Sequence, residues 1–318
     1  MEINAKIMTP EDVALSRNID DYPEGIIIPI DKPYRWTSAD VIRKIKFAAI
    51  RHFGKKNLKV GHAGTLDPLA TGVLLVCIGK ATKLAEWLQS HQKEYIAGIT
   101  FGATTPSYDL EKEIDRFFPY EHITEASVTE ALPAFIGEQD QIAPLFSAKS
   151  VDGVRAYELA RKLHKEGKTL DEAAQELIRT ARINITELEL TAFTVAMSDA
   201  GLGNNPSHSF VVGPSPCGQG GSTVFKTAPA KTGSESCTPE VSKPSSRINV
   251  TDNSALGLPR AVVRMACSKG TYVRAFARDL GEALGSGAHL DSLQRSASGI
   301  FRVENSLTVE QVISLLNK

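Results

Sequence analysis

A loop followed by a buried apolar run constrains this chain more than any other stretch of its sequence. The loop GHAGTLDPLATG extends from Gly61 to Gly72, and the run VLLVCI after it has the length and composition of a strand buried on both faces. Because a proline disfavours helical backbone angles in the residue before it, Pro68 keeps Asp67 extended and directs its carboxylate. The stretch predicts a functional carboxylate at the mouth of a core strand, with an ordinary turn aspartate as the alternative.

Charge is distributed unevenly along the chain, although its sum is small. The 318 residues carry a formal net charge of -1, which argues against a globally basic nucleic-acid-binding protein. From Val41 to His62, however, no residue is acidic. Segregation of this kind predicts a polyanion bound on one face, and a solvated helix surface is the alternative. The side chains of this segment, the basic stripe, are Arg43, Lys44, Lys46, Arg51, Lys55, Lys56 and Lys59, together with His52 and His62.

Apolar periodicity predicts an α+β fold with a central mixed, largely antiparallel sheet flanked by helices. Thr37 followed by Asp40 is typical of a helix N-terminus, and we expect the basic stripe to face outward from that helix. Ser127 with Glu130 predicts a second capping box, for a helix that ends near Gly137. Strands are expected over 25–33, 73–78, 93–102, 182–195, 259–267 and 292–302, and further helices over 80–89, 273–284 and 308–316.

A change in composition marks a segment late in the chain. Between residues 198 and 246 roughly half of the residues are Ser, Gly or Pro. Such a segment has too little apolar content to offset the entropy that is lost on ordering. We therefore expect a flexible insertion over 197–258, in a hairpin connection between two strands.

The cysteines and the lack of long apolar segments indicate the cellular compartment. Cys77, Cys217, Cys237 and Cys267 are scattered without the spacing of a metal site or of a disulfide-rich secreted domain, so we expect reduced thiols. The N-terminal segment lacks the pattern of a signal peptide, and no apolar run approaches membrane-spanning length. These features predict a soluble, cytoplasmic protein with no membrane partner.

Three further residues combine with Asp67 into a predicted pocket for one planar base. We expect Arg274 to pair with a buried Asp67 carboxylate and to keep it ionised and nucleophilic despite desolvation. Tyr272 lies two residues before Arg274, and in an extended segment both side chains can point the same way. Tyr95 and Tyr272 offer aromatic faces on which an extruded base can stack, each worth about 1 to 3 kcal/mol. Each tyrosine alone is more readily explained as a core residue, so the prediction depends on their combination with the loop.

Five motifs occur in a defined order along the chain. They are GHAGTLDPLATGVLLVCIG from Gly61, KEYIAGITFGATTPSYD from Lys93, PLFSAKSVDGVRAYELAR from Pro144, CSKGTYVRAFARDLG from Cys267 and GAHLDSL from Gly287. Together they resemble the bacterial tRNA pseudouridine synthase B family. The resemblance covers about 25–195 and 259–303, and five ordered motifs are far more specific than any single one.

This resemblance implies the pseudouridine synthase fold with a catalytic cleft, no cofactor and no metal. It implies an isomerase that converts uridine to pseudouridine at position 55, in the T stem-loop of tRNA, and we expect a monomer. By the resemblance Asp67 is the catalytic nucleophile, Arg274 its ion-pair partner, Tyr95 the base-stacking residue and Tyr272 the second aromatic residue of the pocket. The implied substrate-binding residues are the two tyrosines with His62, Leu293, Asp109 and Lys149.

The implied reaction begins when the uridine leaves its stack, at a cost of a few kcal/mol that contacts in the pocket offset. Asp67 then attacks C1′ of the ribose or C6 of the ring, or assists loss of the base as a glycal forms. The sequence leaves these three routes open. The freed uracil rotates and rejoins through C5, and a dry pocket is needed to prevent hydrolysis.

Two features depart from the family's ordinary pattern. One is the insertion over 197–258, for which disordered decoration is a simpler interpretation than an extra RNA-binding arm. The other follows the catalytic domain, which we place at 25–303 after an N-terminal extension over 1–24. We expect only a short helix over 304–318 there, where the family commonly carries a small RNA-binding domain. The basic stripe is therefore expected to supply more of the grip on tRNA.

Other classes of protein fit the sequence less well. A nucleobase deaminase needs H-x-E followed by P-C-x-x-C. His164 and Cys217 begin such patterns, but Gly220 stands where the second cysteine belongs. A glycosidase needs paired carboxylates, and the loop has one. Two alternatives stay open, a non-catalytic tRNA-binding chaperone and a guide-RNA-dependent pseudouridine synthase subunit.

Overall fold

The apolar runs of the sequence pair into a ten-stranded mixed sheet in the computed structural model, which describes residues 3–144, 146, 150–151, 154–155, 180–196 and 248–318. Its strands are β1 (Lys6–Ile7), β2 (Ile26–Lys32), β3 (Val60–Ala63), β4 (Ala70–Ile78), β5 (Lys93–Phe101), β8 (Gly137–Gln141), β11 (Ala181–Thr194), β12 (Arg260–Cys267), β13 (Ala288–Ser298) and β14 (Phe301–Arg302). Two short hairpins lie outside this sheet, β6 (Ala103–Thr104) with β7 (Arg116–Phe117) and β9 (Ser150–Val151) with β10 (Val154–Arg155).

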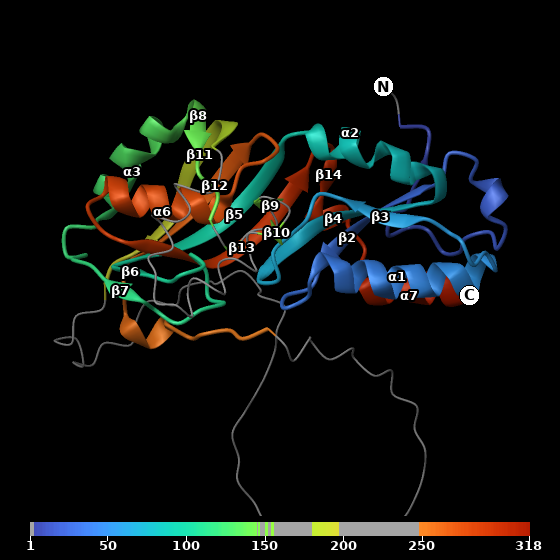
Figure 1. Cartoon of the computed structure of the whole chain (residues 1–318), viewed down its shortest axis with the longest axis horizontal. Helices are drawn as coiled ribbons and strands as arrows, with labels where there is room; N and C mark the ends of the chain where they lie inside the picture. The colour runs from blue at the N-terminus through green and yellow to red at the C-terminus, as the bar shows by residue number, and fades with distance from the viewer. Residues whose placement is uncertain (1–2, 145, 147–149, 152–153, 156–179, 197–247) are drawn as a thin grey trace, which may run out of the picture. The chain divides into compact units, whose positions relative to one another are not determined.

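The strand order is β1-β2-β4-β13-β5-β12-β11-β8, with β3 beside β4 and β14 beside β13 (Figure 1). β1 pairs with β2 and β4 with β13 in parallel, whereas the other pairs in the sheet are antiparallel. This order confirms the predicted α+β fold with a mixed, largely antiparallel sheet.

The helices lie over and around this sheet (Figure 1). Among the residues described, no helix is both long and apolar enough to traverse a lipid bilayer. The α-helices are α1 (Ser38–Phe53), α2 (Ala85–Ser90), α3 (Glu125–Ala131), α6 (Val273–Ala283) and α7 (Val309–Asn317). The 3-10 helices are η1 (Ile19–Asp21), η2 (Gly79–Leu84), η3 (Leu132–Phe135), η5 (Ser254–Leu256) and η6 (Val303–Asn305).

The position of β4 explains why its sequence is continuously apolar. Leu74 and Val76 join the core cluster that contains residues of α1 and α7, while Val73 and Leu75 join a second cluster with Leu88 of α2. In Figure 1, α1 and α7 lie together on one side of this part of the sheet and α2 lies on the other. Because both faces of the strand are covered, no position needs a polar side chain. Each of these side chains stabilises the fold by about 1.5 to 3 kcal/mol.

Helix α1 begins where the sequence predicts. The Thr37 hydroxyl accepts a hydrogen bond from the Asp40 amide at 3.0 Å, and the Asp40 carboxylate accepts one from the Thr37 amide at 3.0 Å. The lysines and arginines of the basic stripe are exposed, as expected. His52 differs from that expectation, because it is buried between the backbone carbonyls of Leu316 and Ser16 at 3.0 and 3.1 Å. It therefore joins α1 to the two ends of the chain instead of facing solvent.

The predicted capping box at Ser127 and Glu130 is wrong by three residues. Thr124 is the N-cap of α3, and its hydroxyl accepts a hydrogen bond from the Ser127 amide at 3.1 Å. The Ser127 hydroxyl in turn accepts one from the Thr124 amide at 2.9 Å. Serine in the third position of the helix can replace the usual Glu or Gln because its hydroxyl also reaches the N-cap amide, so the sequence pattern was misplaced by one turn.

Parts of the N-terminal extension and of the predicted insertion pack against the catalytic domain. In the N-terminal extension, β1 extends the sheet beside β2 and Met8 is fully buried in the core. At the end of the predicted insertion, the Thr251 amide donates to the Leu110 carbonyl at 2.9 Å. The stretch 248–258 is therefore hydrogen-bonded to the body, in contrast to the expected flexible connection, while 197–247 lies outside the described residues.

Candidate active site

The backbone on both sides of Asp67 is held by Lys32 at the end of β2 and by Ser38 at the start of α1. The buried Lys32 ammonium donates to the backbone carbonyls of Pro33, Trp36 and Pro68 at 3.0, 2.6 and 3.2 Å. On the other side of Asp67, the Leu66 amide donates to the Ser38 hydroxyl at 2.9 Å, and that hydroxyl donates back to the Leu66 carbonyl at 3.0 Å. These contacts fix the backbone before and after Asp67. Burial lowers the pKa of Lys32 to about 7, although the nearby carboxylates of Asp67 and Asp31 oppose this shift.

The end of the loop requires a glycine. Gly72 has a φ of +95°, and a Cβ atom there would lie 2.2 Å from the backbone oxygen of Arg295 in β13. The Gly72 amide donates to the Asp31 carboxylate at 3.0 Å. The loop can therefore enter β4 beside β13 only with a residue that lacks a side chain.

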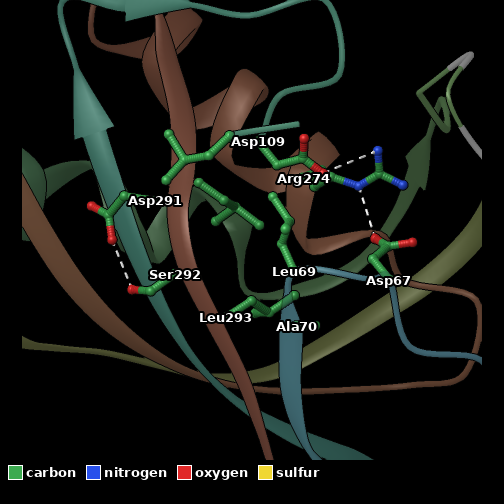
Figure 2. Close-up of a pocket in the computed structure, with 10 residues that line it drawn as sticks. Asp67, Leu69, Ala70, Asp109, Arg274, Asp291, Ser292 and Leu293 are labelled. Carbon is green, nitrogen blue, oxygen red and sulfur yellow. Dashed lines mark hydrogen bonds and ion pairs between the residues drawn. The ribbon is translucent and has the colours of Figure 1, made fainter. Parts of the chain in front are cut away.

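Asp67 and Arg274 form the expected ion pair. Arg274 Nε lies 2.9 Å from Asp67 Oδ2, although the N–H is not aligned for a hydrogen bond, and Figure 2 shows the guanidinium beside the carboxylate. The Arg274 side chain is only 5% exposed, whereas that of Asp67 is 39% exposed. The carboxylate thus opens to the pocket while the cation is buried behind it. The expected burial of the Asp67 carboxylate is therefore wrong, because the arginine is the buried partner.

Arg274 is also held by the segment after β5. Its Nη1 donates to the Ser107 carbonyl at 3.0 Å and lies 3.7 Å from Asp109 Oδ2. Burial disfavours the charged guanidinium, but Asp67 and Asp109 outweigh this effect and raise the pKa of Arg274. Asp109, itself buried, accepts hydrogen bonds from the Ser107 hydroxyl at 2.6 Å and the Glu111 amide at 2.9 Å. Burial raises the pKa of Asp109, and Arg274 acts in the opposite direction.

The expectation that Arg274 lies in an extended segment is wrong. Arg274 is the second residue of α6, and Tyr272 is the extended N-cap residue before the helix. Gln141 of β8 fixes Tyr272, because its side-chain oxygen accepts from the Tyr272 amide at 2.8 Å and its amide nitrogen donates to the Tyr272 carbonyl at 3.2 Å. Both side chains nevertheless line one cavity, since the change from extended to helical backbone occurs between them.

The cavity beside Asp67 has a volume of about 310 Å³ and joins residues from distant parts of the sequence. Tyr95 of β5, Leu293 of β13 and Tyr272 line it together with Asp67 and Arg274. The volume lies at the lower end of the usual range for ligand pockets. Burial raises the pKa of Tyr95, so its phenol is neutral near pH 7. The structure thus brings together a carboxylate, a buried cation and two aromatic side chains.

A smaller neighbouring pocket, drawn in Figure 2, is lined by Asp67, Leu293 and Asp109. Its other walls include Leu69 and Asp291. Six of the predicted site residues therefore line these two pockets, which share Asp67, Arg274 and Leu293. The six are Asp67, Arg274, Tyr95, Tyr272, Leu293 and Asp109.

Two of the predicted site residues are not part of this group. His62 lies in β3, is half-buried and lines neither of these two pockets. Burial and the charge of Arg295 lower the pKa of His62, so its imidazole is neutral near pH 7. Lys149 lies outside the residues that the structure describes.

Arg295 is a residue of the site that sequence reasoning missed. It lies in the wall of the 310 Å³ cavity and is 2% exposed. Its Nε donates to the Val73 carbonyl at 2.7 Å and its Nη2 to the Gly64 carbonyl at 3.2 Å, so it joins β13 to both ends of the loop. The available signal was its spacing, because residues two apart in a strand face the same side and Leu293 was already a candidate.

Backbone strain also marks the flanks of the site. Arg35 and Tyr108 have φ values of 63° and 56°, which are unusual for residues other than glycine. The Arg35 amide donates to the Pro68 carbonyl at 3.0 Å, and Tyr108 directly precedes Asp109. Strain of this kind persists where the surrounding structure imposes it, often near active sites.

The site combines a carboxylate, a guanidinium cation and two aromatic rings. Within the described ranges, no group of three or more His, Cys, Asp or Glu side chains is arranged to hold a metal ion. The residues present can hold a planar, uncharged ring between aromatic faces and present one carboxylate to it. A reaction that they support directly is therefore nucleophilic or electrostatic catalysis by Asp67.

Comparison with known proteins identifies relatives that match most of the chain. Residues 51–200 match the family described as "TruB family pseudouridylate synthase (N terminal domain)", and residues 274–318 match the "tRNA pseudouridylate synthase B C-terminal domain". The chain is 43% identical over 290 residues to tRNA pseudouridine synthase B of Phocaeicola vulgatus, covering 91% of this chain and 92% of that protein. It is 36% identical to tRNA pseudouridine synthase B of Flavobacterium johnsoniae, covering 95% and 96% of the two chains.

A solved structure shares the fold. In a crystal structure of a Cbf5-Nop10-Gar1 complex, one chain superposes with a TM-score of 0.52 at 21% identity. The match covers 98% of this chain and 61% of that one, so this chain spans less than two thirds of its structural neighbour.

Proposed function

The chain belongs to the TruB family of pseudouridylate synthases, and we propose that it isomerises uridine to pseudouridine in tRNA, at position 55 in the T loop. The observation that carries this proposal is the Asp67–Arg274 ion pair of 2.9 Å at a cavity walled by Tyr95 and Tyr272. An ionised carboxylate and aromatic walls are what a pocket for an extruded nucleoside needs.

The side chains divide the work as follows. Tyr95 and Tyr272 stack on the extruded base, each contributing about 1 to 3 kcal/mol toward the cost of unstacking. Asp67 is the nucleophile, and its exposure to the cavity lets it reach the nucleoside. Arg274 fixes the direction of the Asp67 carboxylate, because the guanidinium is buried and is itself held by its hydrogen bond to the Ser107 carbonyl.

The reaction exchanges one bond for another without gain or loss of atoms. The bond between C1′ and N1 breaks, the uracil rotates in the pocket, and a bond forms between C1′ and C5. The proton on C5 leaves and N1 ends with a proton. Attack at C1′, attack at C6 and formation of a glycal all require the same three conditions, an ionised Asp67, a retained base and the exclusion of water.

Leu293, Asp109, His62 and Lys149 complete the proposal as substrate-binding residues. Leu293 gives the pocket an apolar wall beside Asp67. Asp109 acts on the substrate through the position of Arg274, which it contacts at 3.7 Å. His62 lies near the start of the loop that contains Asp67 and contacts RNA there, outside the uridine pocket. Lys149 is assigned from the family motif alone.

The RNA partner is the T stem-loop, bound by a monomer. Phosphate contacts to the T stem-loop come from the α1 part of the basic stripe, where Arg43, Lys44, Lys46 and Arg51 are exposed. Such contacts are independent of sequence and weaken with salt.

The alternatives have less support. A non-catalytic chaperone does not need a carboxylate held by a buried cation inside an aromatic pocket. The likeness to the Cbf5 chain, at 21% identity, shows the fold alone and does not favour a guide-RNA-dependent subunit. The relatives named tRNA pseudouridine synthase B are 36% and 43% identical over nearly the whole chain.

The test is the Asp67→Asn variant on a T stem-loop RNA. We expect no pseudouridine after incubation, detected by a chemical probe that marks this base, while RNA affinity stays within a few fold of wild type. Asn keeps the size of the side chain but is not a carboxylate nucleophile. The control is Asp140→Asn, an exposed carboxylate on β8, which is expected to keep full activity. Turnover by Asp67→Asn would refute the assigned nucleophile.

A further inference from the structure

Two lysine-bearing segments that are distant in sequence meet at one end of the sheet. Val60 of β3 pairs with Ile78 of β4 in an antiparallel register, so the residue before β3 lies beside the residue after β4. The Gly79 amide donates to the Lys59 carbonyl at 2.8 Å and holds the two segments together. The basic stripe is thereby extended by lysines of η2, which the sequence alone did not connect with it.

Four lysines from these segments line one pocket of about 500 Å³. Lys55 and Lys59 come from the connection between α1 and β3, and Lys80 and Lys83 come from η2. All four side chains are exposed. We refer to the pocket that they line as the lysine pocket.

Acidic groups neutralise only part of the lysine pocket. Lys80 Nζ lies 3.8 Å from a Glu24 carboxylate oxygen, and Asp20 also belongs to the wall. The other three lysines form no ion pair with any residue in the described part of the chain. The pocket therefore offers net positive charge to a ligand.

The lysine pocket and the uridine cavity lie at opposite ends of β4. Asp67 precedes the strand and Lys80 follows it, and the strand has nine residues. At about 3.3 Å per residue, this places the lysine pocket roughly 25 to 30 Å from Asp67. A small substrate held at Asp67 cannot reach it, but a long polyanion can.

We propose that the lysine pocket binds the phosphate backbone of tRNA outside the T stem-loop, as a second contact remote from the uridine cavity. This inference rests on the proposed function for the identity of the RNA. Exposed ammonium groups on flexible stems suit phosphates of variable position and read no base sequence. The contact therefore adds affinity for the whole tRNA and leaves the chemistry at Asp67 unchanged.

The test compares full-length tRNA with an isolated T stem-loop. The variant is Lys55→Gln, Lys59→Gln and Lys83→Gln together, with Lys80 kept because it contacts Glu24. A matched control removes three positive charges elsewhere, by Arg182→Gln, Arg264→Gln and Arg302→Gln. These three arginines contact glutamates on the other part of the sheet. Dissociation constants are measured by filter binding at several salt concentrations.

We expect the lysine variant to bind full-length tRNA about 10-fold more weakly near 0.1 M salt. The slope of log affinity against log salt falls by about two to three, roughly one for each lost phosphate contact. Affinity for the T stem-loop stays within about twofold, and the control stays close to wild type on both RNAs. These results would support the proposal.

Two results would overturn it. Unchanged affinity for full-length tRNA would show that the lysine pocket makes no such contact. An equal loss on both RNAs would show that these lysines act at the T stem-loop or through the fold. Failure of the proposed function is seen separately, as wild-type protein that binds tRNA but forms no pseudouridine, because the binding comparison does not depend on turnover.

Discussion

Replacement of Arg274 by glutamine is predicted to damage both stability and activity, because one buried cation serves two carboxylates. Arg274 lies 2.9 Å from Asp67 and 3.7 Å from Asp109, and its side chain is 5% exposed. Glutamine removes the charge and leaves the carboxylate of Asp109, which is 6% exposed, without its cation. Breaking a buried ion pair from one side costs about 3 to 5 kcal/mol of unfolding free energy.

The loss is predicted to depend on pH in a defined direction. Burial raises the pKa of Asp109 in the folded wild type, and removal of Arg274 raises this pKa further. In the folded variant Asp109 therefore keeps its proton at pH values where the unfolded chain has already released it. This pH window begins near 3.8 and ends at the raised pKa of Asp109 in the folded variant. Across this window the stability of the variant falls as pH rises. The destabilisation relative to wild type is thus largest near pH 7.5 and shrinks on acidification.

The assay is urea unfolding of both proteins at pH 7.5 and pH 5, together with pseudouridine formation under single-turnover conditions. Activity is expected to fall about 100-fold or more, because Asp67 loses the group that directs its charge. Arg182→Gln serves as control, since this exposed arginine pairs with exposed acids and such pairs are worth about 0 to 1 kcal/mol. An Arg274→Gln protein within 1 kcal/mol of wild type at pH 7.5, or a loss that does not shrink at pH 5, would refute this reasoning.

Three further predictions follow from the supports of the site. Lys32→Met leaves three carbonyls without their donor, and the buried carbonyl of Trp36 alone costs about 1 to 3 kcal/mol. The variant is expected to lower the turnover rate more than the affinity for RNA. The pKa of Lys32 is about 7 in the folded protein and 10.5 in the unfolded chain, so this group makes the unfolding free energy of the wild type rise with pH between these values. In Lys32→Met, the unfolding free energies measured at pH 7 and pH 9.5 are expected to differ less than in the wild type. Tyr95→Phe is expected to keep RNA affinity within about twofold, whereas Tyr95→Ala loses about 1 to 3 kcal/mol of stacking, and equal affinities by filter binding would exclude a stacking role. Deletion of 197–247 is expected to leave pseudouridine formation on the T stem-loop unchanged, and a large loss in that assay would show that the insertion contributes to the site.

Local chemistry made much of this fold predictable. The hydroxyl cap at Thr37 and the unbroken apolar run before Ile78 each act over a few residues, so periodicity and residue type were sufficient to place them. The capping box at Thr124 shows the limit of such signals, because the spacing of a polar pair was right while its position was one turn away.

The partners that complete the site depended on strand order and register. Arg295 reaches the Gly64 carbonyl only because β13 lies beside β4, and Gln141 fixes Tyr272 across more than a hundred residues of sequence. Lys59 and Lys80 meet because β3 and β4 run antiparallel. The sequence by itself determined which side chains carry the chemistry, since residue type and local backbone preference are properties of short segments. Their neighbours were decided by the tertiary structure, since contacts between distant segments form only when the whole core packs.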